Sequence, residues 1–218
     1  SMYNVLIADD HAVVRYGLSS LIGEQPNFKV VDQAANGTDT YLRVERGDID
    51  ILVMDLSMPP GESGLITTQR IHDQFPNVRI LILSMHEEQE YINQAIHNGA
   101  MSYVLKSSSD DELLHALTAL SNGDTYIDKN IKISKTDLEQ INSGDVNVSL
   151  KSYNALSKRE RDVLPLVTLG YSNKEIAAEL FISTKTVEAH KASIMHKLKL
   201  HSRADLIRYA VHHHLIDI

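Results

Sequence analysis

Three carboxylates directly follow short apolar runs of the chain. Asp9 and Asp10 come after Tyr3–Ala8, and Asp55 comes after Asp50–Met54. If these runs are neighbouring strands, the carboxylates crowd at one edge of a sheet, which is unfavourable without a cation. Mg²⁺ prefers oxygen ligands and keeps several waters. The pattern therefore predicts a magnesium site.

A hydroxyl and a lysine complete the set of groups that could do chemistry at this edge. Ser84 follows the fourth apolar run and Lys106 follows the fifth. A carboxylate nucleophile, a divalent ion, a hydroxyl and a lysine together suit the binding of a phosphoryl group. The two cations neutralise its oxygens, and the hydroxyl donates a hydrogen bond. Each residue alone has an ordinary structural explanation, but the combination favours phosphoryl chemistry.

The elements that must position these groups alternate over residues 3–123. Runs rich in Val, Ile and Leu are typical of strands covered on both faces, and segments with helical spacing lie between them. Five strands alternating with five helices predict an α/β fold, an open doubly wound parallel sheet of order 2-1-3-4-5 that binds ligands at the carboxyl ends of its strands. The expected strands are Tyr3–Ala8, Phe28–Ala34, Asp50–Met54, Arg79–Leu83 and Ser102–Leu105.

Charge divides the chain into an acidic and a basic part. Residues 154–218 contain 10 Lys or Arg and 7 Asp or Glu, a net charge of +3, whereas the whole chain carries −8 and residues 1–153 therefore −11. This split fits two modules with different partners, and nucleic acid suits the basic one. The absence of cysteine excludes disulfides, thiolate zinc sites and iron–sulfur clusters. With no signal segment and no apolar run near the roughly 20 residues that span a bilayer, we expect a cytoplasmic protein.

The basic part is helical from Leu156 onward. Ser157 with Glu160, and Ser172 with Glu175, have the spacing of capping boxes, which mark helix starts. Helices over residues 173–180 and 184–198 are separated by only three residues, and a fourth helix follows over residues 202–213. The short turn predicts a helix-turn-helix arrangement, in which the second helix enters the major groove of DNA.

Helical spacing divides the side chains of this part into a core and an outer face. The outer face comprises Lys185, Glu188, Ala189, Lys191 and Ala192. The expected core comprises Ile176, Ala177, Leu180, Val187, Ile194 and Leu198. The weakly patterned, polar stretch before it predicts a linker with one short helix over residues 136–141. The expected organisation is thus a first domain over residues 2–123, a linker over 124–153 and a helical domain over 154–218.

The first 123 residues resemble the receiver domain of two-component response regulators, which has a flavodoxin-like (CheY-like) fold. The motifs that carry the resemblance are Asp9-Asp10, Asp55-Leu-Ser-Met-Pro-Pro, Ser84 and Tyr103-Val-Leu-Lys106. By position, the resemblance implies that a sensor histidine kinase phosphorylates Asp55. It also implies a regulator rather than an enzyme, although receivers promote their own phosphoryl transfer and dephosphorylation with Mg²⁺.

The same resemblance implies a role for each remaining residue of the acidic edge. Asp10 would bind Mg²⁺ directly and Asp9 mostly through water, with Asp55 and the backbone carbonyl of Ser57 completing the protein ligands. Lys106 would bind the acyl phosphate, and Ser84 and Tyr103 would form the switch pair.

Three features near the acidic edge depart from the receiver pattern or add to it. The loop Pro59–Gly64 looks one residue longer than usual, which leaves its path near Ser57 open. Ser107 stands where many receivers have proline, so the geometry of the preceding peptide bond is open too. His86, two residues after Ser84, suggests the hypothesis that it affects phosphoryl hydrolysis.

The helical part resembles the four-helix DNA-binding domain of the NarL/FixJ (LuxR-type) regulators. The motifs are Leu156-Ser-Lys-Arg-Glu160, Gly170-Tyr-Ser-Asn-Lys-Glu-Ile-Ala177 and Ser183-Thr-Lys-Thr-Val-Glu-Ala-His-Lys191. The resemblance implies binding to double-stranded DNA by a homodimer that forms on activation. By position, it places Lys185, Glu188, Ala189 and Ala192 near base edges, and Thr184, Thr186 and Lys191 near phosphates.

Within this family, the stretches Asp55–Leu65 and Gly170–Lys191 look most like the nitrogen-regulation (NreC) type of staphylococci. This similarity implies control of nitrate or nitrite respiration genes. Because the chain lacks cysteine, oxygen sensing would belong to the partner histidine kinase.

Two other functions compete with this interpretation. Phosphohydrolases of the haloacid-dehalogenase type also use a strand-end Asp, Mg²⁺, a hydroxyl and a lysine. They carry a second Asp, the general acid and base of the reaction, at the position where this chain has Ser57. Serine cannot perform that proton transfer. A receiver that only binds proteins, with a helical dimerisation module, is the second alternative. Lys185 and Lys191 on an exposed helix argue against it, and salt-dependent binding to duplex DNA would discriminate the two.

Overall fold

The computed structural model describes residues 1–132 and 151–218, which belong to two compact units. Of these residues, 1–58 and 63–132 belong to the first unit, and 59–62 and 151–218 to the second. The short helix expected over residues 136–141 lies outside the described residues. No helix in the described part of the chain combines the length and the apolar character needed to cross a bilayer.

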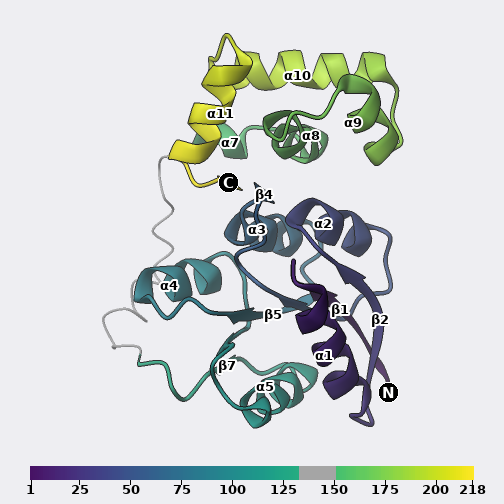
Figure 1. The fold of residues 1–218 in the computed structure, drawn as a ribbon, viewed down its shortest axis with the longest axis vertical. Helices are drawn as coiled ribbons and strands as arrows, with labels where there is room; N and C mark the ends of the chain where they lie inside the picture. Colours follow the sequence, from purple (N-terminus) through teal and green to yellow (C-terminus); the bar gives the residue numbers. More distant parts are fainter. Residues whose placement is uncertain (133–150) are drawn as a thin grey trace. The chain divides into compact units, whose positions relative to one another are not determined.

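A parallel sheet of order β2-β1-β3-β5-β6-β7 forms the centre of the first unit (Figure 1). The five expected strands are present in the expected order, and the short β7 is added beside β6. As a result, β2 and β7 lie at the two edges. The strands are β1 (Tyr3–Ala8), β2 (Phe28–Ala34), β3 (Ile51–Met54), β5 (Arg79–Ser84), β6 (Ser102–Leu105) and β7 (Tyr126–Ile127).

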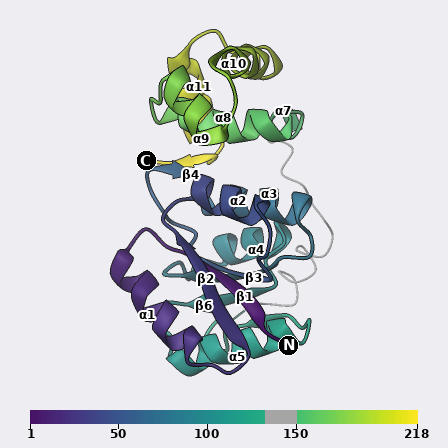
Figure 2. The same ribbon diagram turned by 90° about the vertical axis from the view of Figure 1, so that its right-hand side faces the viewer.

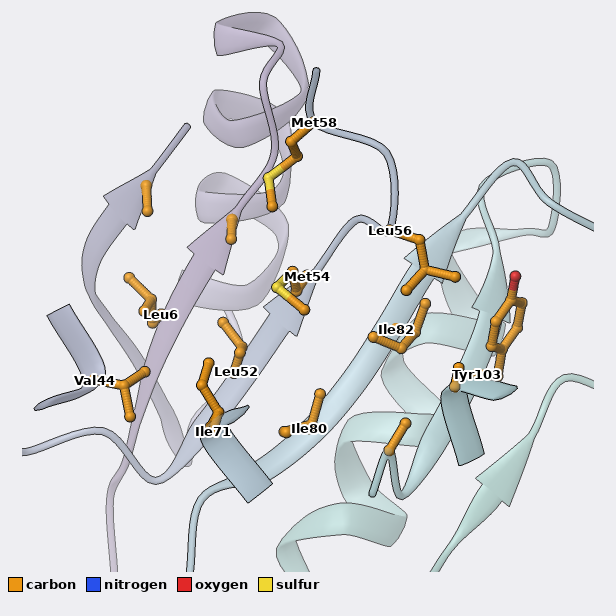
Figure 3. Close-up of a cluster of buried hydrophobic side chains, with 14 of the residues drawn as sticks. Leu6, Val44, Leu52, Met54, Leu56, Met58, Ile71, Ile80, Ile82 and Tyr103 are labelled. Atoms are coloured by element: carbon orange, nitrogen blue, oxygen red, sulfur yellow. The ribbon is translucent and has the colours of Figure 1, made fainter. Parts of the chain in front are cut away.

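Helices cover both faces of this sheet, which explains the continuous apolar runs of its central strands (Figure 2). On one face, α1 (Ala12–Gly23) and α5 (Asp110–Ser121) pack against side chains that include Val5, Val53 and Leu81. The opposite face carries α2 (Gly37–Glu45), α3 (Gly64–Gln74) and α4 (Gln89–His97). Figure 3 shows this second core, in which Leu6, Leu52 and Ile80 come from neighbouring strands.

The structure differs from the sequence expectations at one place in this unit. Beyond residue 123, where the linker was expected to begin, β7 pairs with β6 and the buried Asp128 accepts a hydrogen bond from the backbone of Leu105 at 3.0 Å. The chain therefore stays attached to the sheet up to this point.

The second unit is helical, with α7 (Lys151–Asn154), α8 (Lys158–Thr168), α9 (Asn173–Leu180), α10 (Thr184–Leu198) and α11 (Arg203–His212). Both predicted capping boxes are present, at Ser157 and Ser172, and all six predicted core residues are buried. The three residues between α9 and α10 form the tight turn, with Phe181 in the left-handed conformation (φ 57°). This unit also contains a two-stranded antiparallel sheet of β4 (Gly61–Glu62) and β8 (Ile216–Asp217).

Candidate functional site

The carboxyl ends of β1, β3 and β6 bring Asp9, Asp55 and Lys106 together. The strand ends are tied by backbone hydrogen bonds, because the amide of Asp55 donates to Ala8 at 2.9 Å and the amide of Lys106 donates to Ser84 at 2.8 Å. Parallel strands end at one edge of a sheet, so residues far apart in sequence meet here.

Lys106 joins two buried carboxylates. Its Nζ lies 2.6 Å from Oδ2 of Asp9 and 2.8 Å from Oδ2 of Asp55. The side chains of Asp9 and Asp55 are only 2% and 7% exposed, and that of Lys106 is 15% exposed. Buried charges are stable only when they are paired, so one lysine balancing two carboxylates leaves a net negative site.

Burial and ion pairing act in opposite directions on these groups. Burial raises the pKa of Asp55 despite the hydrogen bond from Lys106. Burial alone would lower the pKa of Lys106, but its bonds to Asp55 and Asp9 outweigh burial and raise that pKa. Lys106 is therefore a fixed cation, and a further positive charge would favour the ionised form of Asp55.

Asp10 and His11 extend the acidic edge toward α1. Oδ1 of Asp10 is buried and has no hydrogen-bond donor among the described residues. Ligand atoms of Asp9, Asp10 and His11 all lie within 4.8 Å of one another, the spread of atoms that can share one metal ion. An unsatisfied carboxylate oxygen beside a second carboxylate fits an oxygen-seeking divalent cation. Sequence reasoning did not include His11, although its place directly after the aspartate pair was a signal.

The segment after Asp55 is held close to the site. The amide of Ser57 donates to Oδ1 of Asp55 at 3.2 Å. A Cβ added to Gly64 would lie 2.5 Å from the carbonyl oxygen of Leu56, so only glycine allows this close approach. The Pro59–Pro60 bond in this loop is cis, and the Lys106–Ser107 bond is trans.

Ser84 and Tyr103 are both fully buried and both contact the backbone of His86. Oγ of Ser84 accepts a hydrogen bond from the His86 amide at 3.0 Å, and the Tyr103 hydroxyl donates to the His86 carbonyl at 2.7 Å. Burial raises the pKa of Tyr103 to about 12, so the hydroxyl stays a donor. The imidazole of His86 stacks on Tyr91 at 4.1 Å and lies 3.3 Å from Glu88. Its contacts are thus with α4, which lends no support to the hypothesis of a role in hydrolysis.

In the second unit, α10 presents an exposed face beside its buried one. Lys185, Glu188, Ala189 and Ala192 are exposed, as is Thr184 in the first turn, whereas Val187 and Ile194 are buried. Thr186 is exposed, but its hydroxyl is hydrogen-bonded to the N-cap Ser183 at 2.8 Å. Helix α10 is therefore the second helix of a helix-turn-helix arrangement, in a unit with excess positive charge.

Three polar contacts join α10 to α8 and α9, and sequence reasoning missed all of them. Nζ of Lys191 donates to Oδ1 of Asn173 in α9 at 2.9 Å. Glu160, which is 3% exposed, pairs with Nζ of Lys197 at 2.5 Å and accepts from Ser193 at 3.2 Å. In the sequence, Glu160 was assigned only to the capping box with Ser157. Its contacts with Lys197 and Ser193 were therefore not predicted.

Comparison with known families agrees with the division of the chain into two units. The family described as response regulator receiver domain matches residues 5–118, and the family of bacterial regulatory proteins, luxR family, matches residues 154–210. The chain is 48% identical over 214 residues to the oxygen regulatory protein NreC of Staphylococcus carnosus, covering 98% of this chain and 99% of that protein. It is 46% identical over 215 residues to NreC of Staphylococcus haemolyticus, with the same coverage.

Solved structures are similar over nearly the full length as well. RcsB from Salmonella enterica serovar Typhimurium, bound to promoter P1flhDC in the presence of the phosphomimetic BeF₃⁻, has a TM-score of 0.58 and 29% identity. The match covers 96% of this chain and 98% of that one. The chain therefore belongs to the response regulators of two-component systems, with a receiver domain followed by a LuxR-type DNA-binding domain.

Proposed function

We propose that Asp55 is the residue phosphorylated by the cognate sensor histidine kinase. The observation that carries this proposal is Lys106, whose Nζ bridges Asp9 and Asp55 at the carboxyl edge of the sheet. A carboxylate oxygen of Asp55 attacks phosphorus while the bond to the leaving group breaks, and the leaving group keeps the electron pair. Lys106 is placed to neutralise charge on the transferred group. The receiver would also promote its own dephosphorylation.

We further propose that Asp9, Asp10, Asp55 and the backbone carbonyl of Ser57 hold Mg²⁺. The unsatisfied Oδ1 of Asp10 and the net negative charge support this assignment. When bound, the ion would neutralise phosphoryl oxygens and offset repulsion between the carboxylates.

Ser84 and Tyr103 are proposed as the switch pair. Both hold the backbone of His86. Because Oγ of Ser84 accepts in that contact, its O–H can donate to a phosphoryl group, and turning Ser84 toward that group would weaken its hold on the His86 amide. Such a change would alter the loop before α4.

Phosphorylation is proposed to switch dimerisation and DNA binding. Lys185, Glu188, Ala189 and Ala192 would face base edges, while Thr184, Thr186 and Lys191 would face phosphates. Glu can accept a hydrogen bond from cytosine, and Ala can contact a thymine methyl group. The first domain, expected over residues 2–123, continues at least to Asp128. We propose residues 154–218 as the second domain, with action in the cytoplasm, where bacterial DNA lies.

The relatives suggest a physiological setting. Two similar proteins are named oxygen regulatory proteins, and we propose that this chain controls genes of the same response, including nitrate or nitrite respiration. The oxygen signal would reach it through the kinase.

Treatment of the full chain with a small acyl phosphate and Mg²⁺ tests the phosphoacceptor. Wild type should gain about 80 Da, the mass of one phosphoryl group, and Asp55→Asn should gain nothing. Asp50→Asn is the matched control, because Asp50 is exposed and precedes the same strand at its opposite end. Equal labelling of Asp55→Asn and wild type would disprove the assignment.

A further inference from the structure

The imidazole of His11 lies against both carboxylates that precede it. Its Nδ1 is 3.0 Å from Oδ1 of Asp10 and 3.3 Å from Oδ1 of Asp9. His11 is also the N-cap residue of α1, yet its side chain makes no capping hydrogen bond. Its backbone amide donates to Oδ1 of Asp9 at 2.8 Å, which fixes that oxygen. The side chain is thus turned toward the acidic edge rather than used by the helix.

The spacing of these three atoms matches one coordination shell. In an octahedral site with bonds of roughly 2.1 Å, neighbouring ligand atoms lie about 3 Å apart. The distances from Nδ1 of His11 to the two carboxylate oxygens, 3.3 and 3.0 Å, are close to this value.

The contact between His11 and Asp10 is not a hydrogen bond. Oδ1 of Asp10 has no hydrogen-bond partner among the described residues, although Nδ1 of His11 lies only 3.0 Å away. The ligand atoms of His11, Asp10 and Asp9 all lie within 4.8 Å of one another, close enough to bind one cation as neighbouring ligands.

We propose that His11 adds a nitrogen ligand to the divalent-ion site at Asp9 and Asp10. The site would then bind ions of the Co²⁺ and Zn²⁺ class more tightly than Mg²⁺, because imidazole suits such ions whereas Mg²⁺ prefers oxygen. This inference rests on the ion site proposed above and adds an ion preference set by one side chain.

Co²⁺ is the probe, since an imidazole bound to it gives strongly shifted, solvent-exchangeable proton signals in NMR spectra. The full chain should show such a signal in H₂O, and excess Mg²⁺ should remove it. His11→Gln should abolish the signal and weaken Co²⁺ binding about tenfold or more, with Mg²⁺ affinity changed less than twofold in calorimetry at the same pH. His115→Gln is the matched control, because His115 is similarly exposed and lies 3.9 Å from a single carboxylate.

Two results would overturn the inference. One is a Co²⁺ affinity and NMR signal that survive in His11→Gln. The other is tighter binding of both ions by that variant, which would make the imidazole a competing cation. Failure of the ion site itself looks different, since wild type would then bind neither ion and Asp55 would be labelled equally with and without Mg²⁺.

Discussion

Replacing Glu160 by alanine removes the side chain that holds the recognition helix α10 on α8. Three groups lose their acceptor: Nζ of Lys197 at 2.5 Å, Oγ of Ser193 at 3.2 Å and the amide of Ser157 at 3.1 Å. Glu160 lies 37 residues from Lys197 in sequence, so this contact is tertiary. The substitution therefore tests how strongly one buried carboxylate positions the DNA-binding surface.

The expected cost follows from the burial of the two partners. Breaking a fully buried ion pair costs about 3–5 kcal/mol, and breaking an exposed pair costs about 0–1 kcal/mol. Glu160 is 3% exposed but Lys197 is 35% exposed, so solvent compensates part of the loss. We expect Glu160→Ala to destabilise the second unit by about 2 kcal/mol and Glu160→Gln, which keeps hydrogen-bonding atoms, by about 1 kcal/mol.

Hydrogen–deuterium exchange within the full chain measures this effect locally. A loss of 2 kcal/mol should speed exchange through local opening about 30-fold in peptides of α8 and α10. Peptides of β1 and β3 serve as an internal control, because they belong to the other unit. DNA affinity should fall in parallel, since α10 would lose its fixed orientation.

Unchanged exchange in α8 and α10 of the alanine variant would refute the reasoning. So would an equal effect of the alanine and glutamine variants, because the hydrogen-bonding atoms that glutamine keeps would then restore none of the interaction.

Three further predictions concern other contacts. Lys191→Ala should lower the magnitude of the slope of log affinity against log salt concentration by about one unit for all duplexes. Glu188→Ala should instead make the binding free energy less favourable by roughly 1–3 kcal/mol, and only through one base pair of the operator. Binding to single-base operator variants at several salt concentrations measures both effects, and a base preference that changes in Lys191→Ala but not in Glu188→Ala would contradict the assignment. Tyr103→Phe removes the hydrogen bond to His86 and should lower the free energy of unfolding by about 1 kcal/mol, with Asp55 still labelled by acyl phosphate; loss of labelling would contradict a role confined to the switch. Burial alone would raise the pKa of Asp128, but hydrogen bonds from Ser108, Asn130 and Leu105 outweigh burial and hold this pKa below 3.8. The ionised carboxylate therefore stabilises the fold at pH values above 3.8, and this stability is lost as the pH falls through the folded pKa. On acidification the melting temperature of Asp128→Asn should fall less than that of wild type, and equal falls in the two proteins would exclude this contribution.

Much of the receiver could be predicted because strands that are buried on both faces consist of short runs of apolar residues. A strand such as Ile51–Met54, buried throughout, reads as a short apolar run, and the strand order then brings Asp9, Asp55 and Lys106 together. The strand β7 was missed because two residues in a polar stretch carry no periodicity. Its position depends on Asp128, whose partner Leu105 is 23 residues away.

In the helical unit, too, features set by nearby residues could be predicted, whereas contacts between helices could not. Capping boxes and core positions depend on neighbours within one helix, so spacing alone predicts them. The pairs Lys191–Asn173 and Lys197–Glu160 depend on how helices pack. Likewise, the approach of His11 to Asp10 depends on a side-chain rotamer, which sequence spacing does not determine.

The two edges of the receiver sheet have a consequence for the behaviour of the protein in a crowded cell. An open strand edge is a template on which another chain can form β-structure and aggregate. The edge strand β2 carries Lys29 and Asp32, and Asp32 holds Arg43 at 2.8 Å, so a second strand would meet charges along this edge. The opposite edge ends in β7, which offers only two residues for pairing. Charge on one edge and the shortness of the other therefore disfavour pairing between the receiver sheets of two copies.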